Sequence, residues 1–191
     1  MIEVLSAERV SPEPWRNGGG FTRELLAWPS AADWQLRISL AEITRDGAFS
    51  AFPGVDRWFA VVDGPGVVLA LPAQRHLLAI DSAPLAFDGT LAPYAELQGG
   101  PTRDLNLMTR RDAGSARMLR ATADDEWFST APVRALFCTA PARLQIDDTD
   151  AARLPAFALA WSTHAARQRW RVVTEREPQH ALWMSFQPVK A

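Results

Sequence analysis

Proline and glycine divide the chain into apolar segments that are too short for ordinary helices, and this pattern constrains the fold most strongly. Within residues 34–40, Trp, Leu, Ile and Leu alternate with Gln, Arg and Ser, which is the period of a half-buried strand. Roughly a dozen segments of this kind follow one another at short spacing. The sequence therefore predicts an all-β fold, built as a large sandwich or barrel system.

Turn residues indicate how some of these strands are connected. An apolar run at 58–62 is stopped by Asp63-Gly64-Pro65-Gly66, and a second run at 67–71 follows at once, which predicts a hairpin. Short helical turns are expected only within 15–27 and 123–128. Further strands are expected at 76–80, 85–87, 116–121, 133–139, 142–146, 156–161, 170–174 and 181–186.

The length of 191 residues fits one large domain or two small ones that share a core. No Ser-rich, Gly-rich or charged linker separates two halves, and no internal repeat is visible. Residues 103–115 are the expected crossing point between the halves.

Composition and charge exclude several classes of partner. A formal net charge of −2 gives no field to steer a polyanion, so we expect no nucleic acid partner. No run approaches the roughly 18 apolar residues of a membrane helix, and no targeting segment is visible. We therefore expect no membrane partner and a cytoplasmic location. The single cysteine, Cys138, lies in an apolar run, which predicts a buried, inert thiol without a disulfide partner.

A cluster of three glycines at 18–20 is the first candidate site. Glycine permits positive φ and close approach of a ligand, and successive backbone amides can bind an anion. The cluster matches neither a P-loop nor a dinucleotide fingerprint. The alternative is a tight structural turn that lets one strand pass another.

The segment 46–57 has turn residues at both ends and two phenylalanines, Phe49 and Phe52, between them. We expect these rings to plug one end of a barrel. Asp56 and Arg57 directly precede the apolar strand at 58–62, so Arg57 is a candidate either for ligand binding or for a structural ion pair.

The segment 103–111 is expected to be a strand that places Asp104, Asn106 and Met108 on one face and Leu105 and Leu107 on the other. If the leucines face outward, the interior receives a carboxylate, an amide and a thioether, which need partners or a ligand. If the leucines face inward, Asp104 and Asn106 are solvated. We favour the first arrangement.

The sequence has no motif for metal binding or for a catalytic nucleophile. His76, His164 and His180 are far apart in sequence, and no Cys cluster or His-x-His pair accompanies them. No Gly-x-Ser-x-Gly elbow is present. We therefore expect no cofactor and no metal site.

In order and spacing, four segments resemble the HutD/Ves family. They are 15–24 (Trp-Arg-Asn-Gly-Gly-Gly with Thr22 and Glu24), 34–39, 46–57 and 103–108. The resemblance implies a bicupin, two packed β-barrels without the cupin metal ligands. It implies an N-terminal cupin barrel at 1–110, which carries the motif-bearing pocket, and a C-terminal β-barrel at 111–191. Strands can be exchanged between the two barrels. One departure is Ala48, where a proline is usual.

The resemblance also implies a function. Members are associated with histidine utilisation, as non-enzymatic regulators that sense an intermediate such as urocanate or N-formylglutamate, and other members are stress-induced. We therefore expect a binding protein for a small anionic metabolite, because arginines can grip carboxylates in bidentate fashion. The expected ligand-binding residues are Trp15, Arg16, Asn17, Gly18, Gly19, Gly20, Thr22, Glu24, Arg37, Asp56, Arg57, Asp104, Asn106 and Met108.

Two further predictions concern geometry. Arg37 should lie on the inner face of the first barrel, because strand alternation separates it from Leu36 and Ile38. The glycine cluster, Arg57 and Asn106 should converge at one end of that barrel.

Two other functions stay open. One is a metal-free cupin isomerase or lyase, whose acid and base would come from Glu24, Asp56 and Asp104. The other is a protein-interaction module that uses some of the eight tryptophans. A homodimer is compatible with each of them.

Overall fold

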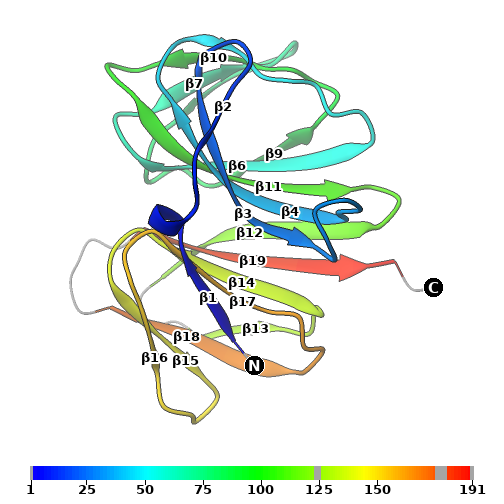
Figure 1. Ribbon diagram of the computed structural model, residues 1–191, viewed down its shortest axis with the longest axis vertical. Coiled ribbons are helices and arrows are strands. Elements are labelled where there is room, and N and C mark those ends of the chain that lie inside the picture. Colours follow the sequence, from blue (N-terminus) through cyan, green and yellow to red (C-terminus); the bar gives the residue numbers. More distant parts are fainter. Residues whose placement is uncertain (1, 123–125, 175–179, 190–191) are drawn as a thin grey trace. The chain divides into compact units, whose positions relative to one another are not determined.

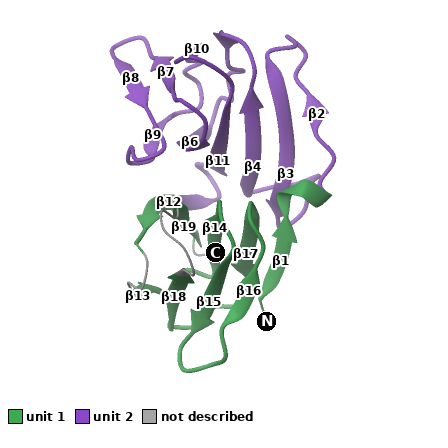
Figure 2. Ribbon diagram, turned by 90° about the vertical axis from the view of Figure 1, so that its left-hand side faces the viewer, with its two compact units in different colours: residues 1–9, 116–191 green, residues 10–115 purple. Residues whose placement is uncertain are grey.

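The computed structural model describes residues 2–122, 126–174 and 180–189. The chain forms two compact units (Figure 2). Unit 1 combines residues 1–9 with 116–191, and unit 2 comprises residues 10–115. Among the described residues, nearly all regular structure is β-strand, as the short apolar segments predict, with one turn of 3-10 helix at Ala7–Arg9. No helix among the described residues is long and apolar enough to span a membrane.

Unit 2 contains two antiparallel sheets (Figure 1). In order across the sheet, the larger one consists of β2 (Glu13–Pro14), β3 (Gly20–Trp28), β4 (Leu36–Ile43), β11 (Thr102–Arg110), β6 (Val55–Asp63) and β9 (Leu85–Asp88). The smaller one consists of β5 (Gly47–Ala48), β10 (Tyr94–Leu97), β7 (Val67–Ala70) and β8 (Arg75–Leu78).

One face of each sheet contributes to the core of unit 2. Phe59 and Val61 come from β6, and Val67 and Leu69 from β7, and all four are buried in one apolar cluster. Because side chains alternate along a strand, the same face of the larger sheet carries Arg57, two residues before Phe59. The apolar cluster and Arg57 therefore share one interior.

The hairpin expected between 58–62 and 67–71 is wrong. Strand β6 lies in the larger sheet between β11 and β9, whereas β7 lies in the smaller sheet between β10 and β8. Both edges of β6 are thus occupied, so the intervening turn carries the chain from one sheet to the other. Gly64 and Gly66 have φ of +94° and +117°, and a Cβ on Gly64 would lie 2.4 Å from the carbonyl oxygen of Pro101. Glycine at these positions permits both the positive φ and the close approach of the turn to neighbouring backbone.

Within 15–27 the structure has a hydrogen-bonded turn at 15–18 but no helix, and residues 20–28 form the nine-residue strand β3. Pairing with β4 along the whole strand outweighs the weak local preference. Of the second expected turn, 126–128 belong to a strand and 123–125 lie outside the described residues.

Unit 1 also contains two antiparallel sheets. The five-stranded sheet has the order β1 (Glu3–Ser6), β17 (Ala158–Ser162), β14 (Val133–Cys138), β19 (Ala181–Pro188) and β12 (Gly114–Ala121). The four-stranded sheet has the order β13 (Glu126–Ser129), β18 (Gln168–Thr174), β15 (Ala142–Ile146) and β16 (Ala152–Leu154). The first strand of the chain thus pairs with β17, which explains why residues 1–9 belong to this unit.

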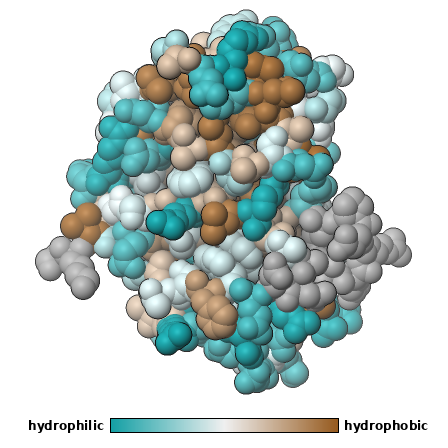
Figure 3. Space-filling view, turned by 180° about the vertical axis from the view of Figure 1, so that it is seen from behind, coloured by the Kyte–Doolittle hydropathy of each residue, from teal (hydrophilic) through white to brown (hydrophobic). Residues whose placement is uncertain are grey.

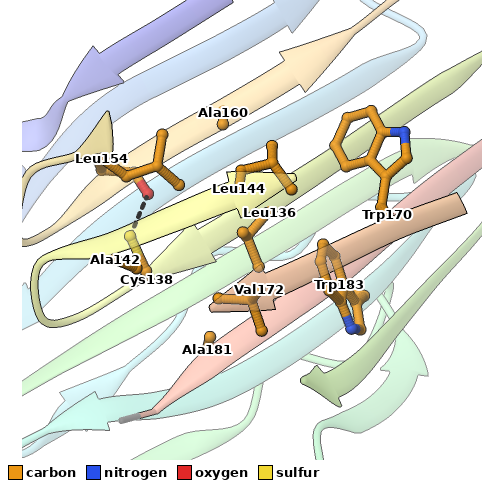
Figure 4. Packing of buried hydrophobic residues seen from close by; sticks show 11 residues of the cluster. Leu136, Cys138, Ala142, Leu144, Leu154, Ala160, Trp170, Val172, Ala181 and Trp183 are labelled. Carbon is orange, nitrogen blue, oxygen red and sulfur yellow. Dashed lines mark hydrogen bonds between the residues drawn. The ribbon is translucent and has the colours of Figure 1, made fainter. Parts of the chain in front are cut away.

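Tryptophans fill the interior of unit 1. Trp127 and Trp183 stack with ring centroids 5.0 Å apart, and Trp170 meets both rings edge-on. Figure 4 shows how this cluster continues to Cys138, whose thiol is fully buried. Burial raises the pKa of this thiol to about 11, so it is protonated and inert at neutral pH.

A buried cation also stabilises unit 1. The guanidinium of Arg134 donates hydrogen bonds to the carbonyl oxygens of Ser129, His164 and Ala166 and to Oε1 of Gln168, at 2.6 to 3.3 Å. Its carbon lies 5.4 Å from the ring centroid of Trp170. Arg134 therefore uses its terminal nitrogens to hold the chain between β17 and β18.

Large apolar residues are exposed singly over much of the surface. On the face shown in Figure 3, apolar and polar residues are interspersed. The most exposed apolar side chain among the described residues is Leu77 on β8, at 67%. Single exposed residues of this kind are ordinary for a folded surface.

Candidate functional site

A cavity of about 540 Å³ opens in unit 2 on the inner face of the larger sheet. This volume is in the range of small-molecule sites. Eight of the residues expected to bind ligand line it: Trp15, Arg16, Asn17, Thr22, Arg37, Arg57, Asn106 and Met108. The other lining residues are Pro14, Ser39, Ala41, Ala48, Phe49, Ser50 and Phe52.

Two adjacent rows of paired residues form the floor. In one row, Met108 of β11 pairs with Arg37 of β4 on one side and with Arg57 of β6 on the other. In the next row, Asn106 pairs in the same way with Ser39 and Phe59. Because alternate residues share a face, both arginines project from the floor on either side of the Met108 thioether.

Arg57 is the most unusual group in the cavity, since only 6% of its surface is exposed. Its Nη2 donates a 2.9 Å hydrogen bond to Oδ1 of Asn106, and its Nη1 makes a long contact of 3.5 Å with the carbonyl oxygen of Ser50. The rings of Phe49, Phe52 and Phe87 surround the guanidinium at 5.1 to 5.5 Å.

Every one of these partners of Arg57 is neutral. No carboxylate pairs with Arg57 among the described residues, and its Nε has no hydrogen-bond partner there. The structural ion pair considered for Arg57 is therefore not formed within the described part of the chain. Burial lowers the pKa of Arg57 to about 10, so the side chain remains a cation at neutral pH.

Arg37 differs from Arg57 because it has a carboxylate partner. Its Nε lies 2.7 Å from Oε2 of Glu24. Glu24 stands on β3 beside Ser39, just before the bulge at Leu25. The two terminal nitrogens of Arg37 have no partner among the described residues, so they remain donors at the cavity wall.

The rim of the cavity is held by contacts between the loop at 15–19 and the segment at 48–50. The indole of Trp15 donates a 2.7 Å hydrogen bond to Oγ1 of Thr22 and packs edge-on against Phe49. Asn17 accepts a hydrogen bond from the amide of Gly19 at 2.9 Å and donates one to the carbonyl oxygen of Ala48 at 3.3 Å. The side chains of Trp15 and Asn17 thus connect the two loops across the opening.

The glycine cluster does not line the cavity. The amides of Gly18 and Gly19 donate to the carbonyl oxygen of Trp15 and to Oδ1 of Asn17, so they are not available to an anion. Gly20 packs against β4 so closely that a Cβ would lie 2.1 Å from the carbonyl oxygen of Glu42. The structure therefore brings Arg57 and Asn106 together, and gives Gly18, Gly19 and Gly20 a packing role.

The three expected carboxylates also lie outside the lining. Asp56 is exposed and accepts a 2.6 Å hydrogen bond from Nε of Arg111. Asp104 is fully buried, accepts a 2.8 Å hydrogen bond from Oγ1 of Thr102, and leaves its Oδ1 without a partner among the described residues. Burial raises the pKa of Asp104 well above its ordinary range. With Glu24 paired to Arg37, the three carboxylates are not gathered at one reaction centre.

Sequence reasoning missed Ser39 and Phe87 as parts of the site. Strand alternation offered a signal for Ser39, which is two residues from Arg37 in the same predicted strand. No local signal marks Phe87, because its position beside Arg57 depends on the pairing of β9 with β6. Within the described ranges, no group of three or more His, Cys, Asp and Glu side chains is arranged to hold a metal ion.

Comparison with solved structures defines the class. HutD from Pseudomonas fluorescens SBW25 has a TM-score of 0.86 and 25% identity, with all of both chains covered. An oxalate decarboxylase of Bacillus subtilis, 7% identical, has a TM-score of 0.63 over 98% of this chain and 78% of its own, a likeness of fold alone. The chain is thus an all-β protein whose structural neighbours are of the cupin type.

Comparison of sequences defines the family. The HutD family model matches residues 7–180, so the chain belongs to the HutD family. Protein Ves of Cronobacter sakazakii is 36% identical over 135 residues, 70% of this chain and 72% of its own length. A 21.2 kDa protein of Pseudomonas putida, described as uncharacterized and in the hutC 3' region, is 33% identical over 140 residues, 71% of this chain and 73% of its own length. The resemblance seen in the motifs is confirmed.

Proposed function

We propose that the chain is a metal-free bicupin, with one β-barrel in each unit, and that the cavity of unit 2 binds a small carboxylate-bearing metabolite. The protein acts without turnover as a regulator of histidine utilisation. Its ligand is an acidic intermediate such as urocanate or N-formylglutamate.

One observation carries the proposal: Arg57 is a buried cation without a carboxylate partner among the described residues, at the wall of a cavity large enough for a metabolite. A buried, unpaired charge is costly, and proteins usually compensate it with a counter-ion. A carboxylate in the cavity would supply the missing charge. The three phenylalanine rings exclude water and so strengthen such an ion pair.

Asn106 prepares the site for an acceptor. Because its Oδ1 already accepts from Arg57, its Nδ2 is left as a donor, without a partner among the described residues. The terminal nitrogens of Arg37 add donors in the neighbouring row. Arg57, Asn106 and Arg37 together suit an acid with one carboxylate at the buried end and a second acceptor group nearer Arg37.

The comparisons support the biological setting. The Pseudomonas fluorescens HutD structure is described for a formate condition, and formate is the smallest carboxylate. The Pseudomonas putida relative is placed in the hutC 3' region. Membership of the HutD family links the chain to this setting. The buried, unpaired thiol of Cys138 suits a reducing cytoplasm, where we place the protein.

Isothermal titration calorimetry with urocanate, N-formylglutamate and related acids tests the proposal. We expect one of these acids to bind, and Arg57→Ala or Asn106→Ala to weaken its binding by about 1–3 kcal/mol. Arg75→Ala is the matched control, since Arg75 forms an exposed ion pair with Glu96 on β10. If no acid binds and the two cavity variants only unfold at lower temperature, the residues are structural and the proposal is wrong.

The absence of turnover is tested separately. The acid that binds is incubated with the protein and recovered for mass spectrometry and NMR. We expect it to be unchanged, because Glu24, Asp56 and Asp104 are held apart by other interactions. A new product that disappears with Arg57→Ala would favour the isomerase or lyase alternative.

A further inference from the structure

We infer that the cavity selects acids that carry no protonated amine, so that it distinguishes an amino acid from the corresponding deaminated or N-acylated acid. This inference rests on the proposed function and deepens it by naming the chemical class of the ligand.

An ammonium group needs acceptors, and the side-chain oxygens of Asn106, Asn17 and Thr22 each already accept one hydrogen bond. Oδ1 of Asn106 accepts from Arg57, Oδ1 of Asn17 from the amide of Gly19, and Oγ1 of Thr22 from the indole of Trp15. The carbonyl oxygen of Ala48 accepts from Asn17. Only neutral hydroxyls, at Ser39 and Ser50, remain among the lining side chains.

No carboxylate lines the cavity among the residues that the structure describes. By register, two carboxylates neighbour the lining: Glu24 pairs with Ser39, and Asp104, which is fully buried outside the lining, pairs with Ala41. However, Oε2 of Glu24 lies 2.7 Å from Nε of Arg37 in an ion pair that lacks hydrogen-bond geometry. An ammonium in the cavity would therefore face Arg37 and Arg57 with no anion to receive it.

Arg37 consequently has two roles. It offers its terminal nitrogens to the acid, and its positive charge compensates that of Glu24, which weakens Glu24 as a partner for an ammonium. This makes the Arg37–Glu24 pair the determinant of selectivity, and Arg57 with Asn106 the determinant of affinity for the carboxylate.

Two matched pairs of ligands isolate the charge of the amine. L-glutamate is compared with L-2-hydroxyglutarate, and L-histidine with L-imidazolelactate, since a hydroxyl replaces the ammonium at the same carbon in each pair. For a pair whose hydroxy acid binds, we expect the amino acid to bind roughly 100-fold more weakly, because its ammonium is desolvated without a partner.

Arg37→Met and the double variant Arg37→Met/Glu24→Gln test the role of the ion pair. With Glu24 released, the ratio of amino acid to hydroxy acid affinity should rise by roughly 10-fold or more, even though both ligands lose a donor. The double variant should restore the original ratio. Arg75→Met, which breaks the exposed pair with Glu96, should leave the ratio unchanged.

The outcomes separate the inference from the proposed function. If a hydroxy acid and its amino acid bind equally well, the inference is wrong and the proposed function stands. If urocanate, N-formylglutamate and both hydroxy acids all fail to bind, the proposed function and the inference fall together. If Arg37→Met lowers both affinities by the same factor, Arg37 binds the ligand but Glu24 has no part in selectivity.

Discussion

Arg57 meets Asn106 through a buried hydrogen bond of 2.9 Å, so a neutral amide stands where a carboxylate would balance the charge. The amide fixes the direction of the guanidinium without neutralising it. The pair is therefore better suited to receive an anion than to stabilise the folded chain, and the two roles can be separated by measurement.

Arg57→Met should stabilise the protein while it removes acid binding. Methionine keeps the apolar contacts with the phenylalanine rings and removes a cation whose desolvation costs several kcal/mol, although Asn106 loses its partner. We expect the free energy of unfolding, measured by urea titration without ligand, to rise by about 1–2 kcal/mol. A loss of more than about 1 kcal/mol would show instead that the charge supports the fold.

Asp104→Asn should change how stability depends on pH. Burial raises the pKa of Asp104 in the folded state, so above about pH 4 the folded state holds a proton that the unfolded state releases. The unfolding free energy contributed by this group therefore falls as pH rises from about 4 towards the raised pKa. The free energy of unfolding of the Asn variant minus that of the natural protein should therefore increase across that window. Urea titrations from about pH 5 to about pH 8 measure it.

Thr102→Val serves as the second variant for this prediction. The hydroxyl of Thr102 donates to Asp104 and lowers its pKa, so its removal should extend the pH-dependent loss to higher pH. If the free energy of unfolding depends on pH in the same way for all three proteins, the pH dependence does not come from Asp104.

Gly20→Ala should destabilise the protein severely. The new Cβ would lie 2.1 Å from the carbonyl oxygen of Glu42, and two paired strands cannot separate locally without losing hydrogen bonds. We expect a loss of about 3 kcal/mol or more in the free energy of unfolding. Gly47→Ala is the matched control, because its Cβ would have no neighbour nearer than 3.7 Å, and its effect should stay within about 0.5 kcal/mol.

Cys138 should resist thiol reagents until the protein unfolds. The thiol is fully buried and its pKa is raised to about 11, so the thiolate is scarce at pH 8. We expect labelling by a disulfide reagent to be more than about 100-fold slower in the native protein than in urea, where one thiol should react. Rapid labelling without urea would mean that β14 opens readily.

Much of the fold could be predicted because its signals are local. Alternation in 34–40 and 103–111 located β4 and β11, and it also assigned Arg37, Asn106 and Met108 to one face. The order of strands in the sheets could not be predicted, because it depends on pairing between distant segments. The turn at 63–66 has hairpin chemistry, yet it joins two sheets, since β11 and β9 already occupy both sides of β6.

The candidate site was predictable to the extent that it follows strand alternation. The glycines at 18–20 show the limit of sequence reasoning, since a residue without a side chain serves close packing and ligand approach equally well. Gly20 is assigned to packing because a Cβ added there would lie 2.1 Å from the carbonyl oxygen of Glu42. Likewise, no sequence pattern shows that Asp56 pairs with Arg111 and lies outside the cavity.

Strand β11 is paired with β4 from Thr102 to Thr109 and with β6 from Arg103 to Arg110, so the floor of the cavity is fixed on both sides. The opening is built from residues of connecting loops and short strands, such as Arg16 and Ser50. Substitutions at the opening can therefore alter which acid fits, without disturbing the paired strands that hold Arg57 and Asn106. Relatives that keep the floor and vary the opening should bind a carboxylate in the same way. They should differ in the rest of the ligand that they recognise.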